Sequence, residues 1–95
     1  MYQIKLNQSV VDKDIPKLQR AGIDLQTLYK SIKKLQTNPY CNSRAKSGDL
    51  HGIRGMDWKR GYRILFMIHE DLKQVDIISI DHHDEAYRKV KNRIS

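Results

Sequence analysis

Residues 62–80, YRILFMIHEDLKQVDIISI, contain two apolar runs separated by the short polar segment 69–72. In the first run, every second residue from Tyr62 shares one face and Arg63 begins the other, which is the period-2 pattern of a β-strand. The second run, residues 73–80, follows closely enough to fold back beside the first. The sequence therefore predicts an antiparallel β-hairpin here.

Two further elements are predicted on either side of this hairpin. Residues 50–58 are expected to form a third strand of the same meander, in which Gly52 and Gly55 permit bulges or a tight twist. Residues 86–94 place three apolar residues on one side at helical spacing, which predicts a short C-terminal helix.

The N-terminal half changes from a strand pattern to helical patterns. Residues 2–7 alternate between apolar and polar side chains, which predicts a strand. Residues 12–22 and residues 25–37 are predicted as two helices, the second beginning after Asp24 as its N-cap. Residues 40–49 are polar and rich in turn-forming residues, so we expect a loop there.

The element order is βααβββα, which predicts a single α+β domain over residues 1–95. We expect an antiparallel sheet with the helices packed on one face: two N-terminal helices and a short C-terminal helix. A single cysteine, Cys41, excludes an intramolecular disulfide and fits a reducing cytoplasm. No signal-peptide pattern follows Met1, and we expect a cytoplasmic protein.

The chain is strongly basic, with 18 Lys and Arg against 11 Asp and Glu and a formal charge of +7. This balance favours a polyanionic partner, which leaves nucleic acid, an acidic protein or an anionic membrane surface as candidates. No apolar run approaches the roughly 20 residues that a membrane-spanning helix needs.

Four segments carry recognisable motifs: Leu50-His51-Gly52, Gly61-Tyr62-Arg63-Ile64, IDHHDEAY at residues 80–87, and the helical region 15–39 that ends in LQTNP. Together these motifs resemble the RelE/ParE superfamily of bacterial and archaeal toxins from type II toxin-antitoxin modules. The resemblance implies a RelE-like fold and an mRNA endonuclease that acts on the ribosome without a metal or other cofactor. It also implies a cognate antitoxin that binds and inactivates the toxin in a hetero-oligomer.

The implied reaction is attack of a ribose 2′-OH on the adjacent phosphate with expulsion of the 5′-oxygen. It needs a base for the 2′ proton, a cation for the phosphate oxygens and an acid for the leaving oxygen. Arg63 matches the Arg of the family's GYR motif, and a guanidinium suits a phosphate. The alternative is that Arg63 is an ordinary exposed strand residue.

His82 and His83 are the candidate acid and base, because imidazole titrates close to neutral pH. His83 stands where the family frequently has an Arg, and we favour His83 as the general acid. Tyr87 matches the family's Tyr and either stacks on a base, positions the leaving group or fills the core. His51 is the more plausible proton acceptor, while Arg54 and Lys59 are further candidates for that role.

Lys59 and Arg60 form a basic turn beside Trp58, and together with Arg54 they are the candidate RNA-binding residues. The alternative is a solvated hairpin tip with Trp58 folded back onto the sheet. His82 and His83 are also near carboxylates, but adjacent strand residues point to opposite faces, which argues against a shared metal ion.

Two other functions remain open from the sequence. A ParE-like toxin would inhibit DNA gyrase without cutting RNA, and an inactive member of the module would only bind its antitoxin. The presence of Arg63, His82, His83 and Tyr87 together favours the nuclease, because a gyrase inhibitor has no need for proton-transfer groups there.

Overall fold

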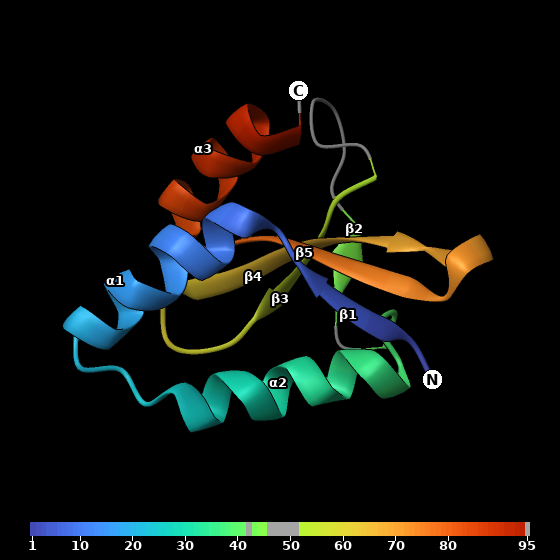
Figure 1. Cartoon of the computed structure of the whole chain (residues 1–95), viewed down its shortest axis with the longest axis horizontal. Coiled ribbons are helices and arrows are strands. Elements are labelled where there is room, and N and C mark those ends of the chain that lie inside the picture. Colours follow the sequence, from blue (N-terminus) through green and yellow to red (C-terminus); the bar gives the residue numbers. More distant parts are fainter. Residues whose placement is uncertain (42, 46–51, 95) are drawn as a thin grey trace.

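A single five-stranded sheet forms the centre of the molecule, with strand order β1-β5-β4-β3-β2 (Figure 1). The structure is a computed structural model that describes residues 1–41, 43–45 and 52–94. Its strands are β1 (Gln3–Leu6), β2 (Arg44–Ala45), β3 (Arg54–Asp57), β4 (Tyr62–His69) and β5 (Gln74–His82). Its helical segments are η1 (Val10–Asp14), α1 (Ile15–Arg20), α2 (Leu25–Thr37), η3 (Glu70–Leu72) and α3 (His83–Ile94).

The predicted hairpin is confirmed as β4 and β5, which pair antiparallel with Tyr62 opposite His82. The pairing contains a bulge, because Leu65 is opposite Ser79 whereas Phe66 is opposite Ile77, so that Ile78 is an extra residue in β5. Ile78 and Ser79 consequently both face α3: Ile78 packs in its apolar cluster and the Ser79 hydroxyl donates to the Ala86 carbonyl, 2.9 Å away.

The sheet has an apolar cluster on each face. On one face, α1 and α2 contribute Leu18, Leu28 and Leu35, which pack with residues of β3, β4 and β5. On the other face, α3 contributes Ala86 and Val90, which pack with Ile53, Leu65 and Ile78. Figure 1 shows α2 and α3 on opposite sides of the sheet. The two N-terminal helices share one face as predicted. The expectation that the C-terminal helix joins them there was wrong, because β4 and β5 carry apolar residues on both of their faces.

The α+β class and the helix at residues 25–37 are confirmed, and Asp24 caps that helix by accepting from the Gln26 amide. The sheet is not wholly antiparallel, because β1 runs parallel to β5. Alternation in residues 2–7 shows which face is buried but carries no information on strand direction. A two-residue strand, β2, also forms in the expected loop and pairs with β3.

Several element boundaries also differ from the sequence prediction. The third strand begins at Arg54, and α3 begins at His83, three residues before the expected start. Asp84 therefore lies within the first turn of α3, where a negative charge is favourable. Within the described residues, no helix is long and apolar enough to cross a membrane.

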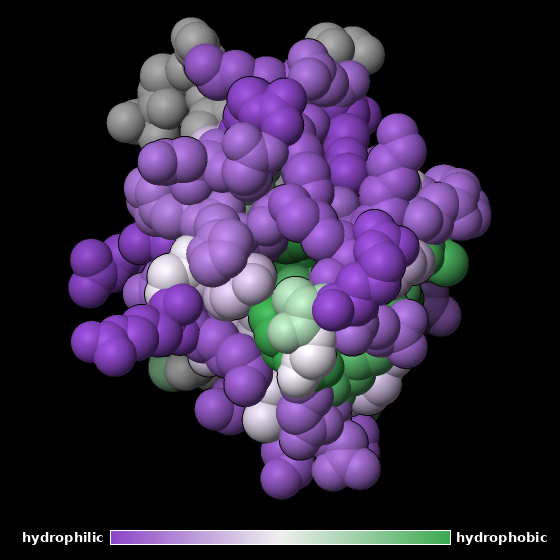
Figure 2. Space-filling model, turned by 90° about the vertical axis from the view of Figure 1, so that its left-hand side faces the viewer, coloured by the Kyte–Doolittle hydropathy of each residue, from purple (hydrophilic) through white to green (hydrophobic). Residues whose placement is uncertain are grey.

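The surface at the end of the molecule that carries α1 and the β3–β4 turn is mostly hydrophilic (Figure 2). Hydrophobic atoms are visible in that view mainly inside a hollow near its centre. The two clusters therefore bury most of the apolar side chains, and this face presents chiefly polar groups to a partner.

Candidate functional site

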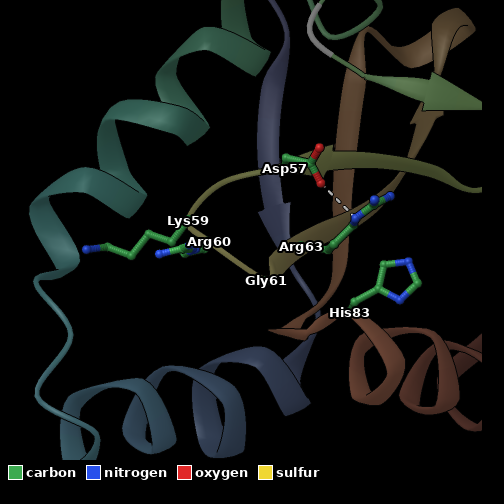
Figure 3. Close-up of a pocket in the computed structure, with 6 residues that line it drawn as sticks. All are labelled: Asp57, Lys59, Arg60, Gly61, Arg63 and His83. Carbon is green, nitrogen blue, oxygen red and sulfur yellow. Dashed lines mark ion pairs between the residues drawn. The ribbon is translucent and has the colours of Figure 1, made fainter.

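A hollow of about 480 Å³ opens where β3, β4 and the first residue of α3 meet (Figure 3). It is lined by Asp57, Lys59, Arg60, Gly61, Arg63 and His83. The start of α3 is tied to the β3–β4 turn because the His83 amide donates to the Gly61 carbonyl, 2.8 Å away. Residues that are some twenty positions apart in the chain are thereby brought to one place.

Arg63 is held at the centre of this hollow by two side chains. Its Nε lies 2.7 Å from Oδ1 of Asp57 in an ion pair, and Asp57 is its cross-strand partner. Its Nη1 donates to the hydroxyl of Tyr87 at 3.1 Å. These contacts fix the plane of the guanidinium, which is the geometry that recognises a phosphate through paired N–H groups.

His83 is positioned beside Arg63 by the first turns of α3. Its ring is in edge-to-face contact with Tyr87, with 4.8 Å between the ring centroids, and its Nδ1 lies 3.0 Å from Oδ1 of Asp84. About half of its side chain is exposed, so a bound molecule can reach the imidazole. The hollow therefore combines a fixed cation with a group that can transfer a proton near neutral pH.

Tyr87 fills part of the core, which is one of the roles left open by the sequence, and it also contacts Arg63. Its hydroxyl accepts from Arg63, while its ring packs against the apolar cluster beneath α3. It is therefore both a core residue and a contact of the candidate phosphate site.

Lys59 and Arg60 line the hollow on the β3–β4 turn, but Figure 3 shows their side chains directed away from Arg63 and His83. The Lys59 ammonium lies over the ring of Trp58, 5.9 Å from its centroid. This places two positive charges at the rim of the hollow.

The structure places His82 on the other side of the sheet from His83. The His82 ring is stacked on Tyr62, with 4.0 Å between the centroids and 28° between the planes. The strand persists through His82, so the alternation of side chains separates the two histidines.

Trp58 and Arg54 are engaged in contacts away from the hollow. The indole Nε1 of Trp58 donates to Thr27 Oγ1 on α2 at 3.2 Å, so this side chain is folded back onto the domain. Arg54 Nε donates to Ser43 Oγ at 2.8 Å, and the guanidinium lies over the ring of Tyr40. His51 lies outside the described residues.

Asp57 is the lining residue that sequence reasoning missed. The alternation of β3 and β4 about the turn places an acid opposite Arg63, and that pairing was the available signal. In the described part of the chain, no three His, Cys, Asp or Glu side chains are grouped so that they could hold a metal ion.

An ionic cluster around two buried carboxylates, Asp14 and Asp81, anchors α3 to the N-terminal segment. Asp81 Oδ2 accepts from Lys89 at 2.6 Å and from Lys17 at 2.9 Å. Burial alone would raise the pKa of Asp81, but these hydrogen bonds outweigh burial and lower the pKa to about 2. Asp14 receives hydrogen bonds from Arg93 at 2.6 and 2.9 Å and from Lys89 at 3.0 Å.

Asp14 also accepts the backbone N–H of Ile80, 2.9 Å away, and its side chain is completely buried. Burial raises its pKa, whereas the bonds from Arg93, the Ile80 amide and Lys89 lower it, with a net result below the usual value. Asp14 and Asp81 therefore act as anions that fix the position of α3.

Comparison with known proteins gives one curated relative and several solved structures, while no family model matches. The putative toxin RelE4 of Methanocaldococcus jannaschii is 27% identical over 92 residues, which are 96% of each chain. A metal-bound toxin from Helicobacter pylori superposes with a TM-score of 0.75 at 24% identity, over 90% of this chain and 98% of that chain. The toxin-antitoxin complex RelBE2 of Mycobacterium tuberculosis contains a chain that superposes with a TM-score of 0.65 at 17% identity, over 86% and 98%.

Proposed function

We propose that this RelE-like toxin of a toxin-antitoxin system is an endoribonuclease that cleaves mRNA and so inhibits translation. The resemblance predicted from the sequence motifs and the RelE-like fold are both confirmed by the relatives. The observation that carries the proposal is that Arg63 of β4 and His83 of α3 line one open hollow and that both contact Tyr87.

The hollow would hold the scissile phosphate on the guanidinium of Arg63. The ribose 2′-oxygen would attack the phosphorus and lose its proton to a general base, while the bond from phosphorus to the 5′-oxygen breaks. His83 as imidazolium would donate a proton to that leaving oxygen. The products are a 2′,3′-cyclic phosphate and a 5′-hydroxyl, and Arg63 stabilises the charge that builds on the phosphate oxygens.

Two partners follow from this proposal. The net charge of +7 suits RNA, including ribosomal RNA, and the affinity should fall steeply with salt because phosphate contacts release counterions. The structural relatives include a toxin-antitoxin complex, and we expect a cognate antitoxin with an acidic segment that covers the basic surface.

The test is induced expression in a bacterial host, with mapping of RNA 5′ ends and a translation assay. We expect translation to stop and new 5′ ends to appear within translated messages. Intact mRNA together with double-strand DNA breaks would instead indicate ParE-like inhibition of gyrase and overturn the nuclease.

The site assignment is tested with Arg63→Ala and His83→Ala, each of which should abolish cleavage while antitoxin binding is kept. Arg20→Ala and His69→Ala are matched controls. Arg20 is exposed at the end of α1, and His69 pairs with Asp76 at the far end of β4. Full cleavage by a folded Arg63→Ala variant would exclude Arg63 as the phosphate-binding group.

A further inference from the structure

We propose that Asp57 is the general base that takes the 2′ proton, an inference that rests on the proposed nuclease function. Asp57 ends β3 at the wall of the hollow, directly opposite Arg63 in the β3–β4 pairing. Its side chain is 77% exposed, so a ribose can approach it. The ion pair with Arg63 is made through Oδ1, and Oδ2 is the oxygen that we assign to the 2′ proton.

The position of Asp57 relative to His83 suits an in-line displacement. In such a reaction the attacking and leaving oxygens lie on opposite sides of the phosphorus, so the base and the acid must also lie on opposite sides. Figure 3 shows the Asp57 carboxylate on one side of Arg63 and the His83 imidazole on the other. A phosphate bound to Arg63 would therefore present its 2′-oxygen to Asp57 and its 5′-oxygen to His83.

The other described residues of the lining are less suited to accept a proton. A lysine ammonium and an arginine guanidinium are protonated at neutral pH and have no free lone pair, which sets aside Lys59 and Arg60. Gly61 has no side chain, and His83 is placed to act as the acid. A carboxylate has two oxygens that can accept a proton, so Asp57 supplies the missing acceptor.

In the complete step, the protons and charges balance with the side chains of Asp57, His83 and Arg63. Asp57 takes the proton of the 2′-OH as the bond from O2′ to phosphorus forms. The bond from phosphorus to O5′ breaks, and the His83 imidazolium protonates O5′. Arg63 keeps its charge throughout, and Asp57 ends protonated while His83 ends neutral.

A structural role for Asp57, in which it only orients Arg63, gives a different expectation. The variant Asp57→Asn has the same shape and keeps an oxygen that can face Arg63 Nε, but its amide cannot accept the 2′ proton. If Asp57 only orients Arg63, this variant should therefore cleave almost normally.

The decisive experiment measures single-turnover cleavage of mRNA on programmed ribosomes by the wild type, Asp57→Asn and His83→Ala. Asp71→Asn is the matched control, because Asp71 is exposed in η3, outside the lining of the hollow. Each protein is assayed with a normal message and with a message whose scissile 5′-oxygen is replaced by sulfur, a leaving group that needs no acid.

We expect Asp57→Asn to be slower than the wild type by at least about 100-fold with both messages, which is the lower end of the contribution of general acid–base catalysis. His83→Ala should be slow with oxygen and recover with sulfur.

Three results would overturn the assignment. An Asp57→Asn rate within threefold of the wild type would show that no proton goes to this carboxylate. Recovery of Asp57→Asn with the sulfur substrate would place Asp57 on the leaving-group side. If the wild type cleaves neither message, both the proposed nuclease function and the assignment of Asp57 as its base are rejected. That result differs from a loss of cleavage in the Asp57→Asn variant alone.

Discussion

Removal of the Asp14 side chain should strongly destabilise the domain. It is completely buried and accepts four hydrogen bonds: two from Arg93, one from Lys89 and one from the amide of Ile80. Asp14→Ala removes the acceptor for all of them. Arg93 and Lys89, whose side chains are only 10% and 17% exposed, then lose Asp14 as a partner. The buried N–H of Ile80 loses its acceptor as well.

The expected loss follows from these groups. Removing one partner of a buried ion pair costs about 3–5 kcal/mol, because the remaining charge stays buried. An unsatisfied buried N–H costs about 1–3 kcal/mol, but the terms share one site and do not add fully. We therefore expect the free energy of unfolding to fall by about 4 kcal/mol, a large part of the roughly 5–15 kcal/mol typical of a domain.

Urea unfolding followed by circular dichroism measures this loss. With an m-value of about 1.3 kcal/mol/M, the midpoint should fall by about 3 M. Asp12→Ala is the matched control, because Asp12 is exposed in the same helical segment and should change stability by less than about 0.5 kcal/mol. The milder variant Asp14→Asn keeps one acceptor and serves if Asp14→Ala does not fold. A loss below about 1 kcal/mol for Asp14→Ala would refute the reasoning.

Three further predictions concern other parts of the fold. The pKa of Asp81 in the folded protein is lowered to about 2, so its contribution to the free energy of unfolding should be present above about pH 4 and lost as the pH falls to about 2. Acid unfolding of the Asp81→Asn variant should lack this loss. Thr27→Val removes the acceptor for the Trp58 indole and should cost about 1 kcal/mol, measured as a melting temperature lower by about 5 °C. Gly61 and Gly22 both have positive φ, so replacement of either by Ala should lower the free energy of unfolding by about 1 kcal/mol. Only Gly61→Ala should also slow cleavage, because the Gly61 carbonyl holds the start of α3.

Apolar periodicity correctly predicted those elements whose residue pattern fits only one type of secondary structure. The β4–β5 hairpin and α2 appear at their predicted places, and Asp24 caps α2 as expected. The bulge at Ile78 lies within an apolar run, where either register would bury similar side chains. The start of α3 was missed because its first residues are polar and add nothing to a helical pattern.

For the candidate site, the resemblance to the RelE/ParE motifs assigned Arg63, His83 and Tyr87 to one site, and the structure brings them together. The positions of Trp58 and Arg54 depend on partners that are distant in the chain. The indole is held by α2 and the guanidinium by the segment that precedes β2. Such side chain to side chain contacts leave no periodic signal in a sequence.

Beyond the end of β1, side chains satisfy the backbone groups at the free edge of β5. The pairing of β1 with β5 stops at Ile77, so the next residues of β5 have backbone groups without a strand partner on that side. Asp14 accepts the Ile80 N–H and Arg93 donates to the Ile78 carbonyl, which satisfies those groups with side chains from η1 and α3.

The same side chains that close the sheet edge therefore anchor α3, and α3 carries His83 and Tyr87 to Arg63. Loss of the ionic cluster should consequently disturb the geometry of the hollow as well as the stability of the fold. A variant such as Asp14→Asn, assayed at a temperature where it is still folded, should cleave RNA more slowly than Asp12→Ala although Asp14 does not line the hollow. Equal rates for the two variants would show that α3 keeps its place through its apolar contacts alone.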